Sequence, residues 1–299
     1  MVVPERGEPA AYTARTPETG PVAVLLNPIA GHGRFSAEIP AVLAALRETG
    51  RPVVTISGDS ADAALAAARA AVADGASALV AVGGDGTVHL GLQAVGGTAV
   101  AFGAVPAGTG NDFAAGVGMP EAPVPAAHVV ADALKAGRTR PVDLARMTDA
   151  EGNQRWFGAV LAAGFDSLVN ELANRMSFPR GPRRYDIAIV LELLRLRPRP
   201  YRIVLDGEPL DVRGVLVAIG NTTSYGGGMK ICPGADPTDG LLDVIVGAEM
   251  GRLTLMRIKP HLYDGTHVDH PLVTTYRART VEIGAPGITG YADGERAFP

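Results

Sequence analysis

Two short segments of the sequence combine glycine with carboxylate and amide side chains, and each directly follows an apolar run. They are Gly83-Gly84-Asp85-Gly86-Thr87, after residues 79–82, and Gly108-Thr109-Gly110-Asn111-Asp112, after residues 100–105. Glycine lets backbone N–H groups approach phosphate oxygens closely, and consecutive N–H groups of this kind bind anions. A carboxylate such as Asp85 would repel a phosphate unless it binds a metal ion or holds the loop in place. Each segment taken alone is equally compatible with a tight turn.

A third loop of similar composition follows the apolar run Val22–Leu26 and contains Asn27-Pro28 and Gly31. Three glycine-containing polar loops after three apolar runs favour a nucleotide-phosphate site over three unrelated turns. Asn111 or Asp112 could instead cap a following helix. No segment matches the Walker A pattern, and no GxGxxG pattern opens the first predicted helix.

Carboxylates gather at two places in the second half of the sequence. Asp236, Asp239 and Asp243 share one Asp- and Gly-rich segment. Their oxygens would suit a hard cation, but an Asp-Gly hairpin turn explains the segment equally well. Asp293-Gly294-Glu295 lies close to Pro299, and composition alone identifies it as one more exposed turn.

Several other chemistries are excluded or disfavoured by composition. Cys232 is the only cysteine, which excludes an internal disulfide and a Cys-cluster zinc site. The six histidines show no HExxH spacing, and no GxSxG segment is present. A net charge of −4 and 5% aromatic residues argue against a nucleic-acid partner.

The elements that must position these residues alternate between strands and helices in the first half. Apolar strands are predicted at Val22–Leu26, Val53–Ile56, Leu79–Val82 and Val100–Val105, with helices over 36–49 and 61–73 between them. This order predicts a doubly wound parallel α/β sheet, whose ligand crevice lies at the carboxyl ends of the strands.

After about residue 145 the pattern changes to frequent strands with alternating apolar and polar residues, which favours an antiparallel sheet or sandwich. The predicted strands are 157–162, 201–205, 212–219, 242–246 and 274–283, and the predicted helices are 166–176, 184–196 and 250–259. The sequence therefore predicts a loosely ordered tail over 1–20, an α/β domain over 21–145 and a β-rich domain over 146–299.

The stretch from Arg175 to Arg202 holds eight arginines against Asp186 and Glu192, with apolar residues between them. A basic amphipathic helix of this kind can lie on an anionic bilayer surface, although a helix packed on its own domain with solvated arginines fits as well. The first 20 residues lack the apolar core of a signal peptide, and no apolar run is long enough to span a bilayer. We therefore expect a cytoplasmic protein with at most peripheral membrane contact.

Taken in order, the motifs resemble the diacylglycerol kinase catalytic-domain superfamily, which includes bacterial diacylglycerol kinases, sphingosine kinases and ceramide kinases. GGDGT alone would also fit NAD kinases, and the later GTGNDFA and DGE segments select the lipid kinases. The matching segments are Asn27-Pro28 with Gly31, 83–87, 106–114, Asp143-Leu144-Ala145, Gly164-Phe165-Asp166, 233–244 and 293–295.

The resemblance implies an N-terminal nucleotide domain, a C-terminal β-sandwich, ATP and Mg²⁺ as cofactors, and phosphoryl transfer to a diacylglycerol- or sphingoid-like lipid. It implies transient membrane association and leaves a homodimer open. The general base would be Glu295 or Asp293. The residues that match the family's nucleotide contacts are Asn27, Pro28, Gly31, Thr55, Gly83, Gly84, Asp85, Gly86, Thr87, Thr109 and Asn111.

The resemblance also implies two metal sites. A structural magnesium site would fall on Asp236, Asp239 and the backbone carbonyl of Leu241. The set that would help hold catalytic Mg²⁺ and its waters is Asp85, Asp112 and Asp143.

Two features depart from the family pattern. His89 and Leu90 stand where the family usually has Asn and Glu, and the sequence ends at Pro299, soon after the DGE motif. The second departure predicts a chain that is truncated or completed by a partner. Two alternatives stay open: an NAD-kinase-like phosphotransferase on a soluble nucleotide, which the GGDGT motif would fit, and a non-catalytic nucleotide- or lipid-binding regulator, which the two departures would support.

Overall fold

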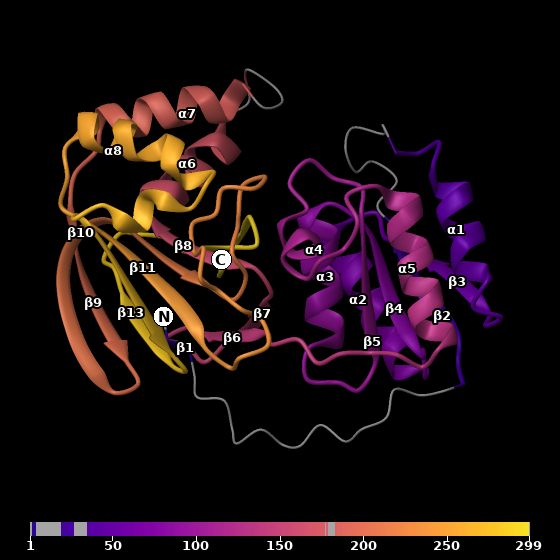
Figure 1. Cartoon of the computed structure of the whole chain (residues 1–299). Helices are drawn as coiled ribbons and strands as arrows, with labels where there is room; N and C mark the ends of the chain where they lie inside the picture. Colours follow the sequence, from indigo (N-terminus) through magenta and orange to yellow (C-terminus); the bar gives the residue numbers. More distant parts are fainter. Residues whose placement is uncertain (1, 4–18, 27–34, 177, 179–182, 299) are drawn as a thin grey trace. The chain divides into compact units, whose positions relative to one another are not determined.

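The computed structural model describes residues 2–3, 19–26, 35–176, 178 and 183–298 (Figure 1). The chain divides into two compact units, with the division between Leu144 and Ala145. Val2 and Val3 form strand β1, which pairs with β13 (Val281–Gly284) and β6 (Ala145–Thr148) of the second unit. The structure thus differs from the expected loose tail at these two residues, because their backbone groups complete an antiparallel sheet.

The N-terminal unit is built on a four-stranded parallel sheet with the strand order β3-β2-β4-β5. β2 and β3 have the predicted bounds, Val22–Leu26 and Val53–Ile56, whereas β4 and β5 span Ala78–Gly83 and Ala101–Pro106. The parallel order requires crossover connections, and helices supply them. The predicted doubly wound α/β sheet is therefore confirmed.

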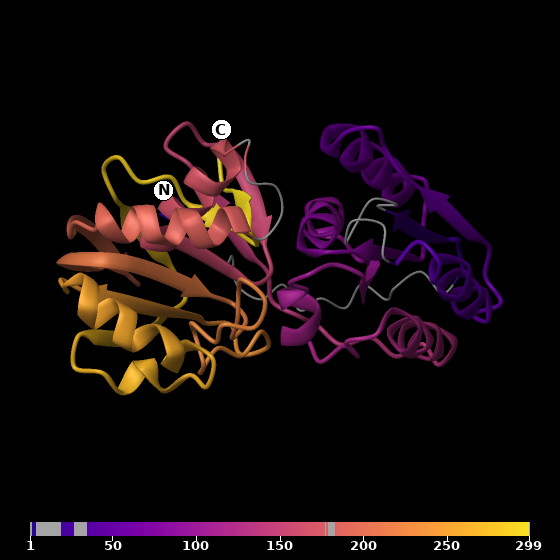
Figure 2. The ribbon, with the colours of Figure 1, turned by 90° about the horizontal axis from the view of Figure 1, so that it is seen from above.

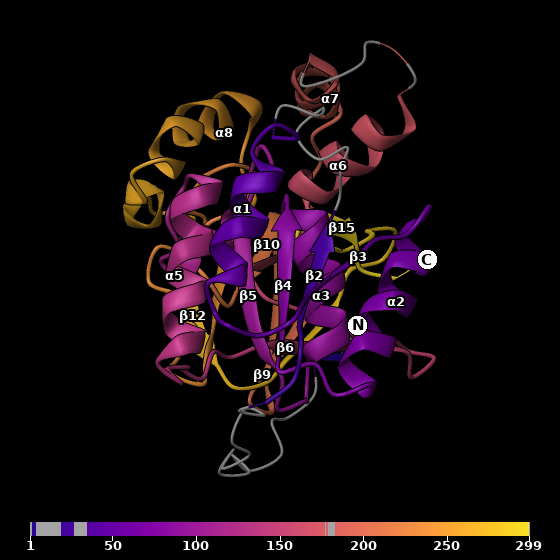
Figure 3. The same ribbon diagram turned by 90° about the vertical axis from the view of Figure 1, so that its right-hand side faces the viewer.

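Helices cover both faces of this sheet because its central strands are apolar on both sides (Figure 3). α1 (Ile39–Arg47) and α5 (Pro123–Lys135) pack on the face that carries Val22 and Val24. α2 (Ala61–Ala73) and α3 (Asp85–Val95) pack on the opposite face. The short helix α4 (Asp112–Gly116) follows β5.

The β-rich unit contains an antiparallel sheet that is folded around one apolar core. Its longest strand, β10 (Glu208–Gly220), pairs with β9 (Arg199–Leu205) over its first half. Its second half pairs with β8 (Val160–Gly164) and with β11 (Leu242–Ala248). The remaining strands are β7 (Gln154–Phe157), β12 (Val273–Ala278), β14 (Tyr291–Ala292) and β15 (Glu295–Arg296).

Three helices of the β-rich unit lie at one end of its sheet: α6 (Phe165–Arg175), α7 (Arg183–Leu194) and α8 (Arg252–Ile258) (Figures 1 and 2). α6 and α7 pack on each other through a small apolar cluster around Val169, Ala173 and Ala188. No helix among the described residues is long and apolar enough to cross a membrane.

Two strands predicted as continuous are interrupted, and hydrogen bonds to a carboxylate far away in the sequence explain both breaks. Residues 157–162 divide at Gly158-Ala159, whose N–H groups donate to the carboxylate of Asp293. Residues 274–283 divide at Arg279-Thr280, whose N–H groups donate to the carboxylate of Asp206. In each case a distant carboxylate replaces a strand partner.

Candidate functional site

The carboxylate of Asp85 connects the two glycine-rich loops of the N-terminal unit. Asp85 is the first residue of α3, and its Oδ2 accepts a hydrogen bond of 2.8 Å from the backbone N–H of Asn111. Its Oδ1 accepts a hydrogen bond of 2.7 Å from the backbone N–H of Asp112, at the start of α4. Of the two roles that the sequence allowed for Asp85, the contacts show the second: its side chain holds a loop.

Asn111 shapes the second loop from within. Its side-chain oxygen accepts from the N–H of Gly108 at 3.0 Å, and its amide nitrogen donates to the Gly108 carbonyl at 3.1 Å. Asn111 has a φ of +60°, a left-handed conformation that Asn tolerates better than most residues. The backbone N–H groups of this loop are therefore fixed by side chains of the loop and of α3.

Glycine is required where the two loops meet. A Cβ on Gly108 would lie 2.3 Å from the Cα of Gly84, and a Cβ on Gly110 would lie 2.3 Å from Oδ2 of Asp85. Neither distance is compatible with a side chain in place. The two loops consequently touch backbone to backbone, which explains why both are rich in glycine.

The other predicted nucleotide contacts occupy different positions. Thr87 is buried on α3, and Thr109 is exposed in the second loop. Thr55 is exposed on the edge strand β3 and is level with Val80, with β2 between the two strands. The structure therefore does not bring Thr55 against the two loops. Asn27, Pro28 and Gly31 lie outside the described residues.

The remaining predicted acidic residues of the N-terminal unit are partly or fully buried. Asp112 is buried at the start of α4, beside the loop that Asp85 holds. Asp143 is half-buried in the segment between α5 and β6. His89 is buried in α3, and Leu90 packs against the apolar core between α3 and the sheet, so both residues of this departure from the family pattern lie on the packed side of the helix.

In the β-rich unit, the two carboxylates of the DGE segment differ sharply. Asp293 is buried, and its carboxylate accepts hydrogen bonds from the N–H groups of Gly158 at 3.1 Å and Ala159 at 2.7 Å. Glu295 is exposed on β15, where it pairs with Ala292 in register. Only Glu295 thus presents its carboxylate to solvent, whereas Asp293 is engaged by backbone.

Asn221 also hydrogen bonds to the Gly158-Ala159 turn that Asp293 contacts. Its side-chain amide donates to the carbonyl of Gly158 at 2.8 Å, and its backbone N–H donates to the carbonyl of Ala159 at 2.8 Å. Asn221 directly follows β10, so the Gly158-Ala159 turn is held both by the DGE segment and by the longest strand of the sheet. Sequence reasoning did not single out Asn221, and no motif marks it.

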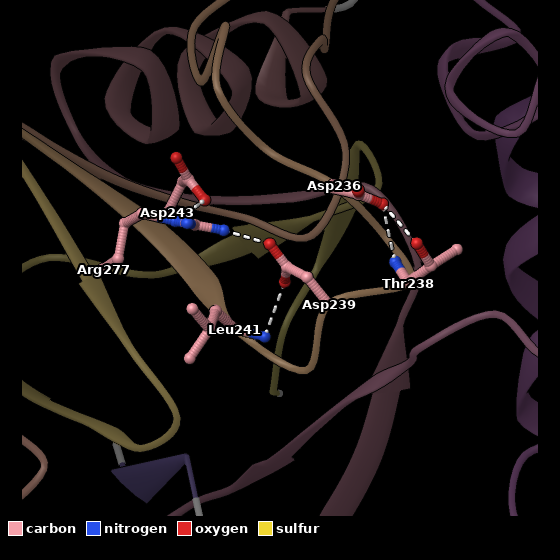
Figure 4. Close-up of polar contacts among 6 residues, drawn as sticks. All are labelled: Asp236, Thr238, Asp239, Leu241, Asp243 and Arg277. Carbon is pink, nitrogen blue, oxygen red and sulfur yellow. Dashed lines mark hydrogen bonds and ion pairs between the residues drawn. The ribbon is translucent and has the colours of Figure 1, made fainter.

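The acidic segment around Asp236 and Asp239 forms a turn closed by its own hydrogen bonds (Figure 4). Asp236 accepts from the backbone N–H of Thr238 at 2.9 Å, and Asp239 accepts from that of Leu241 at 2.8 Å. Arg277 pairs with both Asp239 and Asp243. The described residues include no group of three or more His, Cys, Asp or Glu side chains that could hold a metal ion.

These contacts bear on the magnesium site that the resemblance implies. The oxygens of Asp236 and Asp239 are of the kind that Mg²⁺ prefers. In this structure the guanidinium of Arg277 pairs with Asp239. The magnesium site on Asp236, Asp239 and the backbone carbonyl of Leu241 stays a prediction.

A group that sequence reasoning missed lies next to the DGE segment. Glu171 of α6 accepts a hydrogen bond of 2.7 Å from the hydroxyl of Tyr291, and it forms ion pairs with Arg175 and Arg296. Tyr291 lies on β14 and Arg296 on β15. Glu171 is one of 31 acidic residues, and its distance of 120 residues from Tyr291 leaves no local signal that could have identified it.

Comparison with known proteins places both units in one family. The family model described as "Diacylglycerol kinase catalytic domain" matches residues 21–147, and that described as "YegS C-terminal NAD kinase beta sandwich-like domain" matches residues 159–298. A diacylglycerol kinase of Mycobacterium tuberculosis is 46% identical over 292 residues, which is 97% of this chain and 93% of that protein. The chain belongs to the diacylglycerol kinase catalytic-domain family.

More distant relatives carry related names. A diacylglycerol kinase of Bacillus subtilis is 25% identical over 266 residues, covering 87% of this chain and 84% of that protein. A probable lipid kinase YegS-like of Xanthomonas oryzae is 36% identical over 185 residues, or 59% of this chain and 58% of that protein. The crystal structure of a putative diacylglycerol kinase from Bacillus anthracis has a TM-score of 0.72 at 20% identity, covering 94% of this chain and 91% of that one, and shares the fold.

Family membership confirms the resemblance, the fold class and the prediction of an ATP-dependent lipid kinase. The predicted antiparallel C-terminal domain is confirmed as the sandwich-like domain of this family. The roles of individual site residues stay predictions, and the contacts described above indicate how those roles are divided.

Proposed function

We propose that this lipid kinase transfers the γ-phosphate of ATP to a hydroxyl of a diacylglycerol-like lipid, with Glu295 as the general base. The observation that carries this assignment is the difference between the two DGE carboxylates: Asp293 is engaged by backbone N–H groups, whereas Glu295 is exposed. Two relatives named diacylglycerol kinase that match most of the chain support the choice of acceptor.

In the proposed reaction the lipid hydroxyl oxygen attacks the γ-phosphorus, and the bond from that phosphorus to the β–γ bridging oxygen breaks. Glu295 takes the hydroxyl proton as the new P–O bond forms, and ADP leaves with the electron pair of the broken bond. Phosphoryl transfer of this kind depends mostly on positioning and on neutralising phosphate charge. A carboxylate that accepts the proton must be exposed to the acceptor, which Asp293 is not.

On the nucleotide side, we assign phosphate binding to the loops at 83–87 and 108–112. The N–H groups of Gly108, Asn111 and Asp112 are not part of this assignment, because they donate to the side chains of Asn111 and Asp85. These loops contain no Lys or Arg, and their side chains contribute only the negative charges of Asp85 and Asp112. A bound Mg²⁺ ion would neutralise phosphate charge there. Asp85, Asp112 and Asp143 are the residues proposed to help hold this ion.

The lipid acceptor requires a membrane, and we assign membrane contact to α7 and α8. Exposed apolar side chains share one stripe of α7, at Ile187, Val190 and Leu194, and α8 adds Leu253 and Met256. The side chain of Arg252 in α8 donates to the carbonyl of Leu194, so the two helices are joined at this end of the sheet (Figure 2).

Charge supports the same assignment. Residues 183–202 and 250–263 together contain nine Arg or Lys residues but only two acidic residues, in a chain whose net charge is −4. Exposed apolar side chains flanked by positive charge are typical of surfaces that bind anionic lipid bilayers. The segment from Arg175 to Arg202, identified from the sequence, is thus one part of the proposed surface, and α8 is the other.

The decisive experiment incubates the purified chain with radiolabelled ATP, Mg²⁺ and one acceptor at a time: diacylglycerol in phosphatidylglycerol vesicles, a sphingoid base in the same vesicles, or NAD in solution. We expect labelled phosphatidic acid, and loss of the label with Glu295→Gln. Labelling of NAD alone would contradict the proposal in favour of a soluble phosphotransferase. Labelling of none would contradict it in favour of a non-catalytic regulator.

A further inference from the structure

Glu171 contacts both strands of the hairpin that carries Glu295. Its Oε2 accepts the hydrogen bond from Tyr291 on β14, and the same oxygen lies 3.7 Å from Nε of Arg296 on β15. Asn174, one helical turn further along α6, also hydrogen bonds to the Tyr291 hydroxyl. One face of α6 thus holds the hairpin by both of its strands.

The hairpin register places this contact directly beside the proposed base. Tyr291 pairs with Arg296, and the next pair in the hairpin is Ala292 with Glu295. β15 has only two residues, and its described strand pairing is with β14 alone. Side-chain contacts must therefore supply much of what fixes the direction of this strand, since its backbone ladder is so short.

The contact between Glu171 and Tyr291 is that of two largely buried side chains held in place, and it differs from a mobile ion pair at the surface. Glu171 has 19% of its side chain exposed, and Tyr291 is 3% exposed. The hydrogen bond from Tyr291 holds the pKa of Glu171 below its usual range, with Arg175 and Arg296 acting in the same direction. Glu171 is consequently ionised near neutral pH, where a charged acceptor makes a stronger hydrogen bond than a neutral one.

We propose that Glu171 is a positioning residue of the phosphoryl transfer, which holds the β14–β15 hairpin so that the Glu295 carboxylate meets the acceptor hydroxyl. This inference rests on the proposed role of Glu295 as the base. Glu171 acts through Tyr291 and Arg296 and exchanges no proton with the substrate. Its contribution is geometric, and a base displaced by about 1 Å can cost roughly 100-fold in rate.

The test compares Glu171→Ala, Glu171→Gln and Tyr291→Phe in the vesicle assay. We expect Glu171→Ala to lower kcat by about tenfold to 100-fold, with little change in the KM for ATP. Glu171→Gln keeps an acceptor for the Tyr291 hydroxyl and should recover part of this loss. Tyr291→Phe should lower kcat less than Glu171→Ala, and the double variant should be no slower than Glu171→Ala, because both changes remove the same contact.

A matched control is Glu249→Ala, which removes an exposed ion pair with Arg213 in the same unit, away from the hairpin. It should keep the kcat of the unchanged chain. Thermal unfolding of every variant separates positioning from stability, since a merely structural role would lower the Tm and leave kcat per folded molecule unchanged. If Glu171→Ala does not fold, Glu171→Gln and Tyr291→Phe carry the test.

The inference is overturned if the folded variants at Glu171 and Tyr291 keep kcat, or if the KM for ATP rises as much as kcat falls. Its failure is distinct from failure of the proposed function. An inactive Glu295→Gln with fully active Glu171 variants would remove only the positioning role. An active Glu295→Gln would instead refute the base itself.

Discussion

The carboxylate of Asp293 accepts a hydrogen bond of 2.7 Å from the backbone N–H of Ala159, which lies 134 residues earlier in the chain. This contact joins the DGE turn to the turn between β7 and β8 and buries one of the two DGE carboxylates. It divides the segment into a structural residue and an exposed one. The two acidic residues should therefore respond differently to removal of their charge.

Asp293→Asn should destabilise the β-rich unit, because its amide would place an N–H₂ group against one of two buried N–H donors. A buried donor without an acceptor costs about 1–3 kcal/mol, and denaturant unfolding would measure this loss in the free energy of unfolding. Glu295→Gln should leave the free energy of unfolding unchanged while abolishing lipid phosphorylation. Equal stability of both variants would contradict the division of roles.

Gly108→Ala should impair ATP use. Its Cβ would lie 2.3 Å from the Cα of Gly84, so the loops must move apart. We expect a rise in the KM for ATP of at least about tenfold, since the N–H groups that bind phosphate would be displaced. Gly284→Ala, whose Cβ would meet only ordinary contacts at 3.7 Å, is the control and should keep the KM.

Leu253→Gln combined with Met256→Gln should weaken binding to phosphatidylglycerol vesicles by at least tenfold in a sedimentation assay. Each change removes an apolar side chain worth about 1.5 kcal/mol or more on transfer from water. Binding should also fall as salt rises, because ions screen the basic residues from the lipid. Val129→Gln alters an exposed valine of α5 and should bind like the unchanged chain. Equal binding of all variants would exclude α8 from the membrane surface.

His267 should make the β-rich unit sensitive to mild acid. Its Nε2 donates to the carbonyl of Ile231 at 3.0 Å, its Nδ1 is buried, and burial lowers its pKa below the usual 6.5. Below about pH 6.5 the unfolded chain therefore binds a proton that the folded chain does not, so stability is lost as pH falls. His267→Gln should flatten the Tm between about pH 7 and pH 5. A variant at the exposed His128 should retain the slope of the unchanged chain, and an unaltered slope in His267→Gln would refute the effect.

The elements that the sequence predicts well are those set by local apolar patterns. Val22–Leu26, Val53–Ile56 and Ala61–Ala73 have the predicted bounds, because a short apolar run marks a strand and a longer Ala-rich segment marks a helix. The first helix begins at Ile39 instead of Ser36, since Ser36 does not act as its cap. The positions of the glycine loops and of the DGE segment were likewise visible from composition and family motifs.

What the sequence could not show are contacts between segments far apart in the chain. The hydrogen bonds of Asp85 to the second loop span 26 and 27 residues, and those of Asp293 and Glu171 span far more. Such contacts decide whether a carboxylate is held by backbone, paired with arginine or left exposed. The chemical role of an acidic residue in this chain therefore depends on its partner more than on its motif.

The backbone contact between Gly84 and Gly108 has a consequence for engineering nucleotide preference in this family. Neither loop can be reshaped alone, because the backbone of each packs directly against the backbone of the other. In addition, the Asp85 side chain hydrogen bonds the second loop to the start of α3. A single loop taken from a kinase that uses another phosphate donor would not fit against the backbone of the loop that it contacts here. The smallest unit that can be exchanged is therefore the pair of loops together, with Asp85 retained in the first of them.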